Sequence, residues 1–177
     1  SPIPIRHLNI GGGFGIPYFP GEKPIELSSL SDHFQRLLSL SDQLLPSAKL
    51  IIELGRYLVG EAGVYVCKVI DKKVSRGKTF LITDGGMHHH LAASGNLGQI
   101  IRKNYPVMIA NRAEGLIKET ATIVGPLCTP LDLLADNIEL PKAQEGDLIA
   151  IFQSGAYGLT SSPLRFLSHP APTEILL

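Results

Sequence analysis

The 177 residues of the chain are enough for one substantial hydrophobic core, or for one domain and part of a second. Sixteen basic and sixteen acidic side chains give a formal net charge of zero, which excludes the basic surface typical of proteins that bind nucleic acid or anionic membranes. Although 44% of the residues are hydrophobic, no apolar run approaches the ~20 residues of a membrane helix, so we expect a globular protein.

Two further features of the sequence suggest the cellular compartment of the protein. Neither end shows a secretory or transit pattern, and the two cysteines, Cys67 and Cys128, match no metal-ligand spacing. We therefore expect free thiols in a reducing compartment, the cytoplasm.

Residues 1–59 follow the order strand, glycine turn, helix, strand. A short apolar run at residues 7–10 ends at the sequence GGGFG (residues 11–15, the glycine turn), as expected of a buried strand that enters a tight turn. Leucine and phenylalanine then recur at helical spacing over residues 30–45, and Pro46 stops the helix. A second buried strand is predicted over residues 49–54. This order is typical of a parallel α/β unit, in which ligands lie at the carboxyl ends of the strands.

In residues 60–177 the sequence pattern changes to short apolar or β-branched runs that are separated by Gly, Pro, Asn and Asp. These runs predict a mostly antiparallel β-domain, with the domain boundary between Val59 and Gly60. The predicted strands cover residues 64–70, 79–83, 107–110, 120–124 and 148–152, and turns are predicted at 75–78 and 145–147.

Candidate ligand groups follow both predicted strands of the first part. Backbone N–H groups of the glycine turn could close around a phosphate, because glycine permits close approach and positive φ, although a flexible strand-to-helix turn explains the same residues. Glu53 and Arg56 place a carboxylate and a guanidinium after a buried strand, where a charged pair is costly unless it is used. The guanidinium fork suits phosphate oxygens, and the carboxylate suits a cationic ring nitrogen. A structural salt bridge is the alternative.

The second part contributes a cysteine, a tyrosine and a row of histidines. Cys128 lies in a proline-containing loop (residues 125–132, the cysteine loop), and Tyr157 lies between glycines; in isolation such residues are more often structural than catalytic. Three adjacent histidines, residues 88–90, could suggest a metal ion. Neighbouring side chains on a strand point to opposite faces, however, so we expect no metal site there.

Taken in this order, the glycine turn, residues 53–56, the cysteine loop and residues 155–157 resemble the second half of the ornithine/diaminopimelate/arginine decarboxylase family. These enzymes depend on pyridoxal 5'-phosphate, and their fold is a (β/α)8 barrel followed by a β-domain. The resemblance implies that residues 1–59 form the last part of the barrel and residues 60–177 the C-terminal β-domain. It also implies a homodimer with shared active sites.

The resemblance assigns most of the candidate residues to the cofactor's phosphate. Gly12 and Gly13 would bind that phosphate together with Arg56, and Gly55 belongs to the same cofactor-binding segment. Tyr157 would reach the same group.

The remaining two residues would serve the reaction itself. Glu53 would bind the pyridine nitrogen and keep it protonated, so that the ring accepts the electrons left by the loss of CO2. Cys128 would donate a proton to the carbanion at the cofactor of the partner subunit. Because racemases of the same fold use an arginine at the ring nitrogen, Glu53 favours decarboxylation over racemisation.

Two departures from the family pattern concern the far end of the substrate. Diaminopimelate decarboxylases have an arginine for a distal carboxylate where residues 88–92 (HHHLA) contain none, and Thr129 replaces the acidic residue that takes a distal amine. A site that lacks both partners should select a different substrate. The segment is similar to decarboxylases of exopolysaccharide gene clusters and to those acting on a glutamyl thioester of an acyl carrier protein. We therefore expect a masked or carrier-linked amino acid.

Two alternatives remain open at this point. The first is a diaminopimelate decarboxylase that acts on the free small-molecule substrate, and the second is a non-catalytic dimerisation or carrier-binding module. By the resemblance, the family's Schiff-base lysine would precede Ser1, so this chain alone is expected to lack activity.

Overall fold

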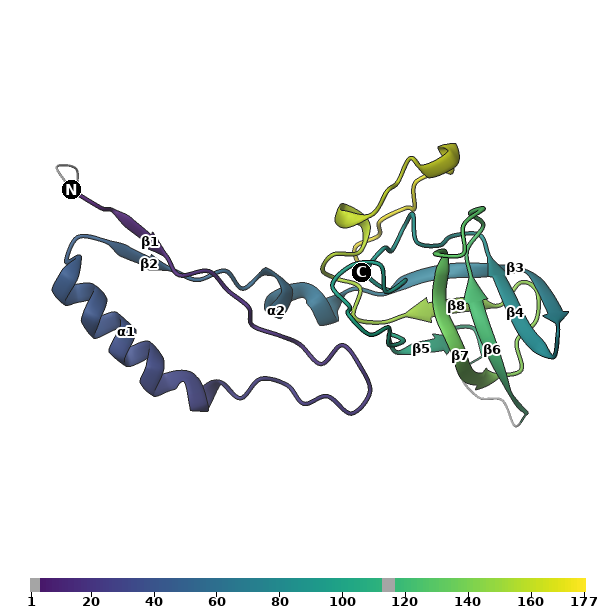
Figure 1. Ribbon diagram of the computed structural model, residues 1–177, viewed down its shortest axis with the longest axis horizontal. Helices are drawn as coiled ribbons and strands as arrows, with labels where there is room; N and C mark the ends of the chain where they lie inside the picture. The colour runs from purple at the N-terminus through teal and green to yellow at the C-terminus, as the bar shows by residue number, and fades with distance from the viewer. Residues whose placement is uncertain (1–3, 113–116) are drawn as a thin grey trace.

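The computed structural model describes residues 4–112 and 117–177. The molecule is elongated, with a small lobe that contains the N-terminal elements and a larger lobe built on a β-sheet (Figure 1). A short helix, α2 (Gly55–Val59), lies between the two lobes and continues into the 3-10 turn η2 (Gly60–Ala62). Among the residues that the structure describes, no helix is long and apolar enough to cross a lipid bilayer.

The small lobe is a single βαβ unit. Strand β1 (His7–Asn9) pairs in parallel with β2 (Lys49–Ile51), and the crossover contains η1 (Leu27–Leu30) and α1 (Ser31–Leu44). The helix ends just before Pro46, which cannot continue it. Phe14 stacks on Phe34 with ring centroids 6.0 Å apart, so the glycine turn is packed against α1. The predicted strand, glycine turn, helix and strand are confirmed, although both strands end earlier than expected.

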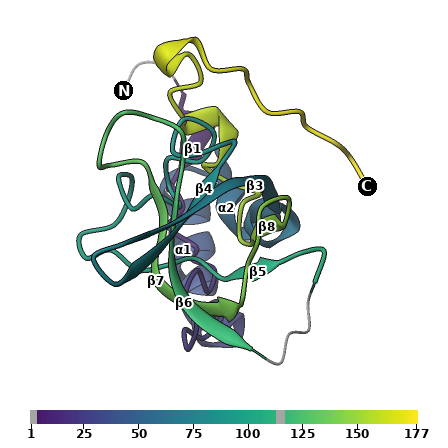
Figure 2. The ribbon, with the colours of Figure 1, turned by 90° about the vertical axis from the view of Figure 1, so that its right-hand side faces the viewer.

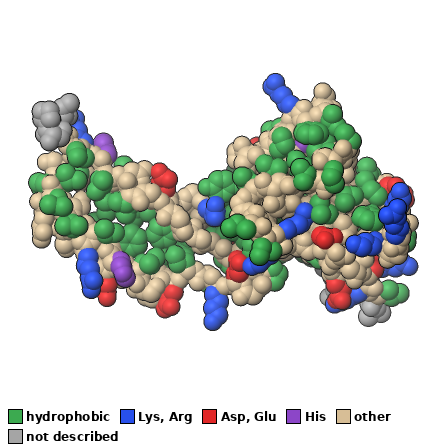
Figure 3. All heavy atoms as spheres, viewed as in Figure 1, with side chains coloured by type: hydrophobic (Ala, Val, Ile, Leu, Met, Phe, Trp, Pro, Cys, Tyr) green, Lys and Arg blue, Asp and Glu red, His purple; other side chains and the backbone are tan. Residues whose placement is uncertain are grey.

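The small lobe exposes much apolar surface. Leucines of α1 keep between 41% and 68% of their surface in contact with solvent, namely Leu37, Leu38, Leu40 and Leu44. Figure 3 shows hydrophobic side chains spread over this lobe. The two-stranded sheet therefore buries only part of the apolar residues that its helix and strands supply.

The large lobe is a six-stranded sheet with the order β5-β8-β3-β4-β6-β7 (Figure 2). Its strands are β3 (Tyr65–Ser75), β4 (Lys78–Thr83), β5 (Val107–Ile109), β6 (Lys118–Val124), β7 (Leu133–Pro141) and β8 (Leu148–Ile151). All neighbouring strands are antiparallel except β4 and β6, which are parallel. The prediction of a mostly antiparallel β-domain is confirmed.

The main hydrophobic core lies in this sheet. Its largest fully buried side chains are Leu81, Ile109, Ile123, Leu134, Ile149 and Ile151. Tyr18 and Phe19, from the irregular stretch after the glycine turn, pack against the same core, so the small lobe is anchored to the sheet by aromatic rings. Two short 3-10 turns, η3 (Leu159–Ser161) and η4 (Phe166–Ser168), follow the last strand.

Three details of the prediction were wrong. Strand β7 was missed, because Asp136 and Asn137 interrupt its apolar pattern; Asn137 has φ +46° at an irregularity in the pairing with β6. Strand β3 runs five residues past the predicted end at Ile70. The three histidines lie in a turn and an irregular residue and not on a strand, so their side chains do not alternate between the two faces of a sheet.

Candidate functional site

The glycine turn and Glu53 are joined by hydrogen bonds at the end of the parallel strand pair. The Asn9 side-chain amide donates to Glu53 Oε1 at 2.8 Å, and Asn9 Oδ1 accepts from the Gly11 amide at 2.8 Å. The Glu53 amide donates to the Gly11 carbonyl oxygen at 2.8 Å. A Cβ atom at residue 12 would collide with the Glu53 carbonyl, so this approach requires Gly12. Asn9 therefore fixes one carboxylate oxygen of Glu53.

Arg56 lies between two tyrosine rings that come from different lobes. Its guanidinium carbon is 5.5 Å from the centre of the Tyr18 ring and 4.9 Å from that of Tyr157. Such contacts contribute about 0.5–1 kcal/mol each at exposed sites. Burial raises the pKa of Tyr18, while the neighbouring Arg56 acts in the opposite direction. The two rings hold the guanidinium in one place without using its N–H donors.

Glycines explain how Tyr157 reaches Arg56. The Ser154 amide donates to the Gly63 carbonyl at 2.9 Å, and the Gly155 amide donates to the Gly60 carbonyl at 3.0 Å. A Cβ atom on residue 63 or 155 would collide with the opposite backbone. Tyr157 follows with φ +56°, a conformation that costs a non-glycine residue about 1–2 kcal/mol. The two glycines and this left-handed residue together bring the ring of Tyr157 next to Arg56.

A pocket of about 240 Å³ opens between the two lobes next to Arg56. Arg56 is the one charged side chain among the nine residues that line it, which are Tyr18, Phe19, Arg56, Ala92, Leu97, Gly98, Gln99, Tyr105 and Tyr157. Ala92 keeps 4% of its surface exposed, and Tyr105 keeps 5%. The pocket can therefore hold an anionic group at Arg56 and neutral groups elsewhere.

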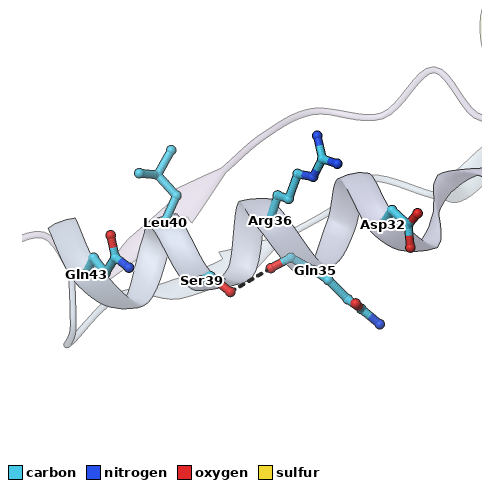
Figure 4. Close-up of a pocket in the computed structure, with 6 residues that line it drawn as sticks. All are labelled: Asp32, Gln35, Arg36, Ser39, Leu40 and Gln43. Atoms are coloured by element: carbon cyan, nitrogen blue, oxygen red, sulfur yellow. Dashed lines mark hydrogen bonds between the residues drawn. The ribbon is translucent and has the colours of Figure 1, made fainter.

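A larger groove of about 610 Å³ runs along α1, away from these residues (Figure 4). It is lined by Asp32, Gln35, Arg36, Ser39, Leu40 and Gln43, all from this one helix. The hydroxyl of Ser39 donates to the Gln35 carbonyl oxygen at 2.9 Å, which leaves it part of the helix surface. Because one helix supplies every wall, the groove does not enclose a ligand.

Cys128 is exposed and lies in the cysteine loop between β6 and β7. It is not among the residues that line the Arg56 pocket. The structure thus brings together Arg56 and Tyr157, and separately Gly12 and Glu53. Gly13 (φ +94°) lies in the same glycine turn, and Gly55 begins helix α2 with Arg56 as its second residue.

The three histidines of residues 88–90 are buried and packed on one another and on aromatic rings. His88 lies 3.9 Å from His89 and 5.1 Å from His169 between ring centroids, and His90 accepts or donates a hydrogen bond at Ser154 Oγ (2.9 Å). Burial lowers the pKa of His88 and of His90 to about 4. Across residues 4–112 and 117–177, no group of three metal-ligating side chains converges on one point.

Two residues of the site were missed by sequence reasoning. Asn9 stands at the carboxyl end of β1, where ligand groups of α/β units gather, so its position was the available signal. Tyr18 lies in an irregular Pro/Gly stretch without periodicity, and the sequence offers no pattern that would connect it to Arg56.

Comparison with known proteins identifies relatives along most of the chain. The family described as "Pyridoxal-dependent decarboxylase, C-terminal sheet domain" matches residues 30–155. The L-glutamyl-[BtrI acyl-carrier protein] decarboxylase of Niallia circulans is 46% identical over 176 residues, which cover 96% of this chain and 40% of that protein. The diaminopimelate decarboxylase of Aquifex aeolicus is 34% identical over 98% of this chain and 38% of its own length.

Solved structures give the same result for the fold. The diaminopimelate decarboxylase of M. jannaschii, solved in complex with L-lysine, superposes with a TM-score of 0.80 at 27% identity, over 97% of this chain and 38% of that one. The chain therefore spans about two fifths of the length of the relatives that it matches.

Proposed function

Because this chain belongs to the pyridoxal-dependent decarboxylase family, we propose that it forms part of an enzyme that decarboxylates an amino acid whose distal end is linked to an acyl carrier protein. The barrel segment would comprise residues 1–59 and the C-terminal β-domain residues 60–177. The observation on which the proposal rests is the pocket beside Arg56, which combines one cation with otherwise neutral walls.

The residues present fit pyridoxal 5'-phosphate. Gly12 permits close backbone approach next to Glu53, and the guanidinium of Arg56 is held between Tyr18 and Tyr157 with its donors available for phosphate oxygens. When bound, the cofactor supplies the electron sink for the pair of electrons that loss of CO2 leaves behind.

In this assignment Glu53 holds a proton at the ring nitrogen. Asn9 donates to Oε1, so the carboxylate is oriented and its other oxygen remains to accept the hydrogen bond from the ring. Gly13 and Gly55 would flank the phosphate together with Arg56 and Gly12. These assignments are supported by the order of the motifs and by the local geometry of each.

Cys128 is proposed to donate the proton that replaces CO2. Cys128 is exposed and does not line the pocket of its own chain, which supports a role at the site of a partner subunit in a homodimer. The cysteine loop would then complete a site that one chain leaves open.

The carrier-linked substrate is supported by Ala92 and Thr129. Ala92 lines the pocket where, by the resemblance, diaminopimelate decarboxylases place an arginine, so a free distal carboxylate would lack its partner there. Thr129 likewise offers no charge to a distal amine. The relative from Niallia circulans, which by its name acts on a carrier-bound glutamyl group, supports the same substrate class.

The second candidate is decarboxylation of free diaminopimelate, favoured by the similarity to the Aquifex aeolicus and M. jannaschii enzymes. The test measures CO2 release by the whole protein that contains this chain, with carrier-linked glutamate, free glutamate and free diaminopimelate. We expect kcat/KM to be about 100-fold or more higher for the carrier-linked substrate. Efficient turnover of free diaminopimelate, together with none of the carrier-linked group, would contradict the proposal.

A matched pair of variants sharpens this test. Ala92→Arg should restore a cation for a distal carboxylate and raise the relative turnover of diaminopimelate. Ala93→Ser, a change at the adjacent buried position that introduces no charge, should leave the ratio between substrates unchanged.

A further inference from the structure

Asp132 closes the cysteine loop and is buried beneath it. Asp132 keeps only 3% of its surface exposed. Its carboxylate accepts hydrogen bonds from the Leu127 amide at 2.8 Å and from the Met87 amide at 2.6 Å. The backbone of Asp132 completes the loop, because its amide donates to the Thr129 carbonyl and its carbonyl accepts from the Gly125 amide, both at 3.1 Å. Residues 125 and 132 are therefore held together directly.

The space around this carboxylate is filled to the limit of atomic contact. A Cβ atom at residue 86 or 125 would collide with the Asp132 oxygens. Glycine is thus required on both segments that surround the carboxylate, Gly86 in the turn before the histidines and Gly125 at the start of the cysteine loop.

A buried carboxylate without a cationic partner costs several kcal/mol, and an apolar residue would fill such a position at lower cost. Within residues 4–112 and 117–177, no salt bridge to Asp132 is present. Its charge is compensated by two charge-assisted hydrogen bonds from backbone amides, which fix direction more strongly than apolar packing does. The two amides precede Cys128 and His88 by one residue each.

We infer that Asp132 is a positioning residue that fixes Cys128 relative to residues 87–92. Cys128 follows Leu127, whose amide Asp132 holds, while Ala92 lies on the segment that follows Met87. One carboxylate thereby ties the loop of the proposed proton donor, which would serve the partner's site, to the segment whose Ala92 lines this chain's own pocket. This inference rests on the proposed function for its catalytic meaning, but its geometric content concerns the loop alone.

The test uses the full chain with a nitroxide spin label on Cys128. Cys67 is buried and burial raises its pKa to about 12, so the exposed thiol takes the label. In the wild-type chain we expect a restricted label and slow hydrogen exchange at the Met87 and Leu127 amides. Asp132→Ala should free the label and speed exchange at both amides by about ten-fold or more, the factor for one lost hydrogen bond.

Three further variants separate positioning from folding. Asp132→Asn keeps one acceptor, so it should speed exchange at one of the two amides. Gly125→Ala keeps the Asp132 side chain but displaces its carboxylate, and it should free the label even if Asp132→Ala does not fold. Asp84→Asn is the matched control, since Asp84 is exposed and its carboxylate accepts a backbone amide, that of Lys68, at 2.8 Å; it should change neither reading.

A label at Ser75→Cys in a Cys128→Ser background reports on the remote β3–β4 turn and should be unaffected by Asp132→Ala. Unchanged label mobility and unchanged exchange at both amides in Asp132→Ala and in Gly125→Ala would overturn the inference. In the whole protein, Asp132→Asn should lower kcat without changing cofactor affinity. If the wild-type protein bound no pyridoxal phosphate while the loop results held, the proposed function would fail and the positioning role would stand.

Discussion

Replacing Tyr18 by alanine removes a ring that joins the two lobes. The ring lies 5.5 Å from the Arg56 guanidinium and 5.1 Å from the centre of the Tyr105 ring. The cation–π contact contributes about 0.5–1 kcal/mol. The aromatic pair adds about 0.5–1.5 kcal/mol, so Tyr18→Ala should lower the free energy of unfolding by about 1–2.5 kcal/mol.

Urea unfolding followed by circular dichroism measures this change, with Tyr18→Phe as the control. Phenylalanine keeps the ring and its contacts, so that variant should stay within about 0.5 kcal/mol of the wild type. A loss in Tyr18→Phe as large as that in Tyr18→Ala would show that the hydroxyl and not the ring matters. A change below about 0.5 kcal/mol in Tyr18→Ala would refute the reasoning that the ring anchors the small lobe.

Three further outcomes follow from buried ionisable groups. Burial alone raises the pKa of Asp147, but hydrogen bonds from Arg112 and from neighbouring amides outweigh burial and leave the pKa lowered from 3.8. The stabilising effect of the Asp147 carboxylate is therefore complete above pH 3.8 and is lost as the pH falls below that value. Asp147→Asn should therefore cost about 1–3 kcal/mol at pH 7 in urea unfolding and much less near pH 3. Burial lowers the pKa of His90 to about 4, so the wild type should lose stability between pH 6.5 and 4, and thermal unfolding of His90→Gln should show a weaker dependence there. Iodoacetamide at pH 8, followed by mass spectrometry, should modify Cys128 and leave Cys67 intact in the folded chain; equal modification of both would contradict the burial of Cys67.

Local sequence patterns were sufficient for the βαβ unit and for most strands. The apolar run at residues 7–10, the glycine turn and the leucine spacing of α1 each act within a few residues, so they could be recognised without the rest of the fold. The end of β3 could not, because Lys72 in the charged sequence after Ile70 is stabilised by Glu119 on β6, 47 residues away. Strand β7 was hidden for the same reason.

In β7, Asp136 is stabilised by partners that are distant in sequence. Its amide donates to Asn104 Oδ1 at 2.9 Å, and its carboxylate accepts from the Thr122 hydroxyl at 2.9 Å. Such contacts let polar residues occupy a strand whose sequence looks like a turn. The site shows the same limit, because the motifs identified Arg56 and Tyr157 but could not show that Tyr18 lies on the other side of the guanidinium.

The role of the three histidines was also out of reach of the local pattern. Their burial depends on rings and backbone from distant segments, including Tyr65, whose hydroxyl lies 3.0 Å from His89 Nδ1, and Pro170, whose carbonyl lies 2.8 Å from His89 Nε2. The sequence indicated only that they are adjacent. Their packing on one another and on these distant segments becomes evident only in the folded chain.

Equilibrium binding of pyridoxal 5'-phosphate to the whole protein that contains this chain tests the central claim most directly. The wild type should bind the cofactor, and Arg56→Lys should weaken binding by about 10- to 100-fold, since lysine cannot reproduce the planar fork between two rings. Arg76→Lys, at the exposed β3–β4 turn, is the matched control and should bind like the wild type. No binding by the wild type, or equal affinity in Arg56→Lys, would contradict the account.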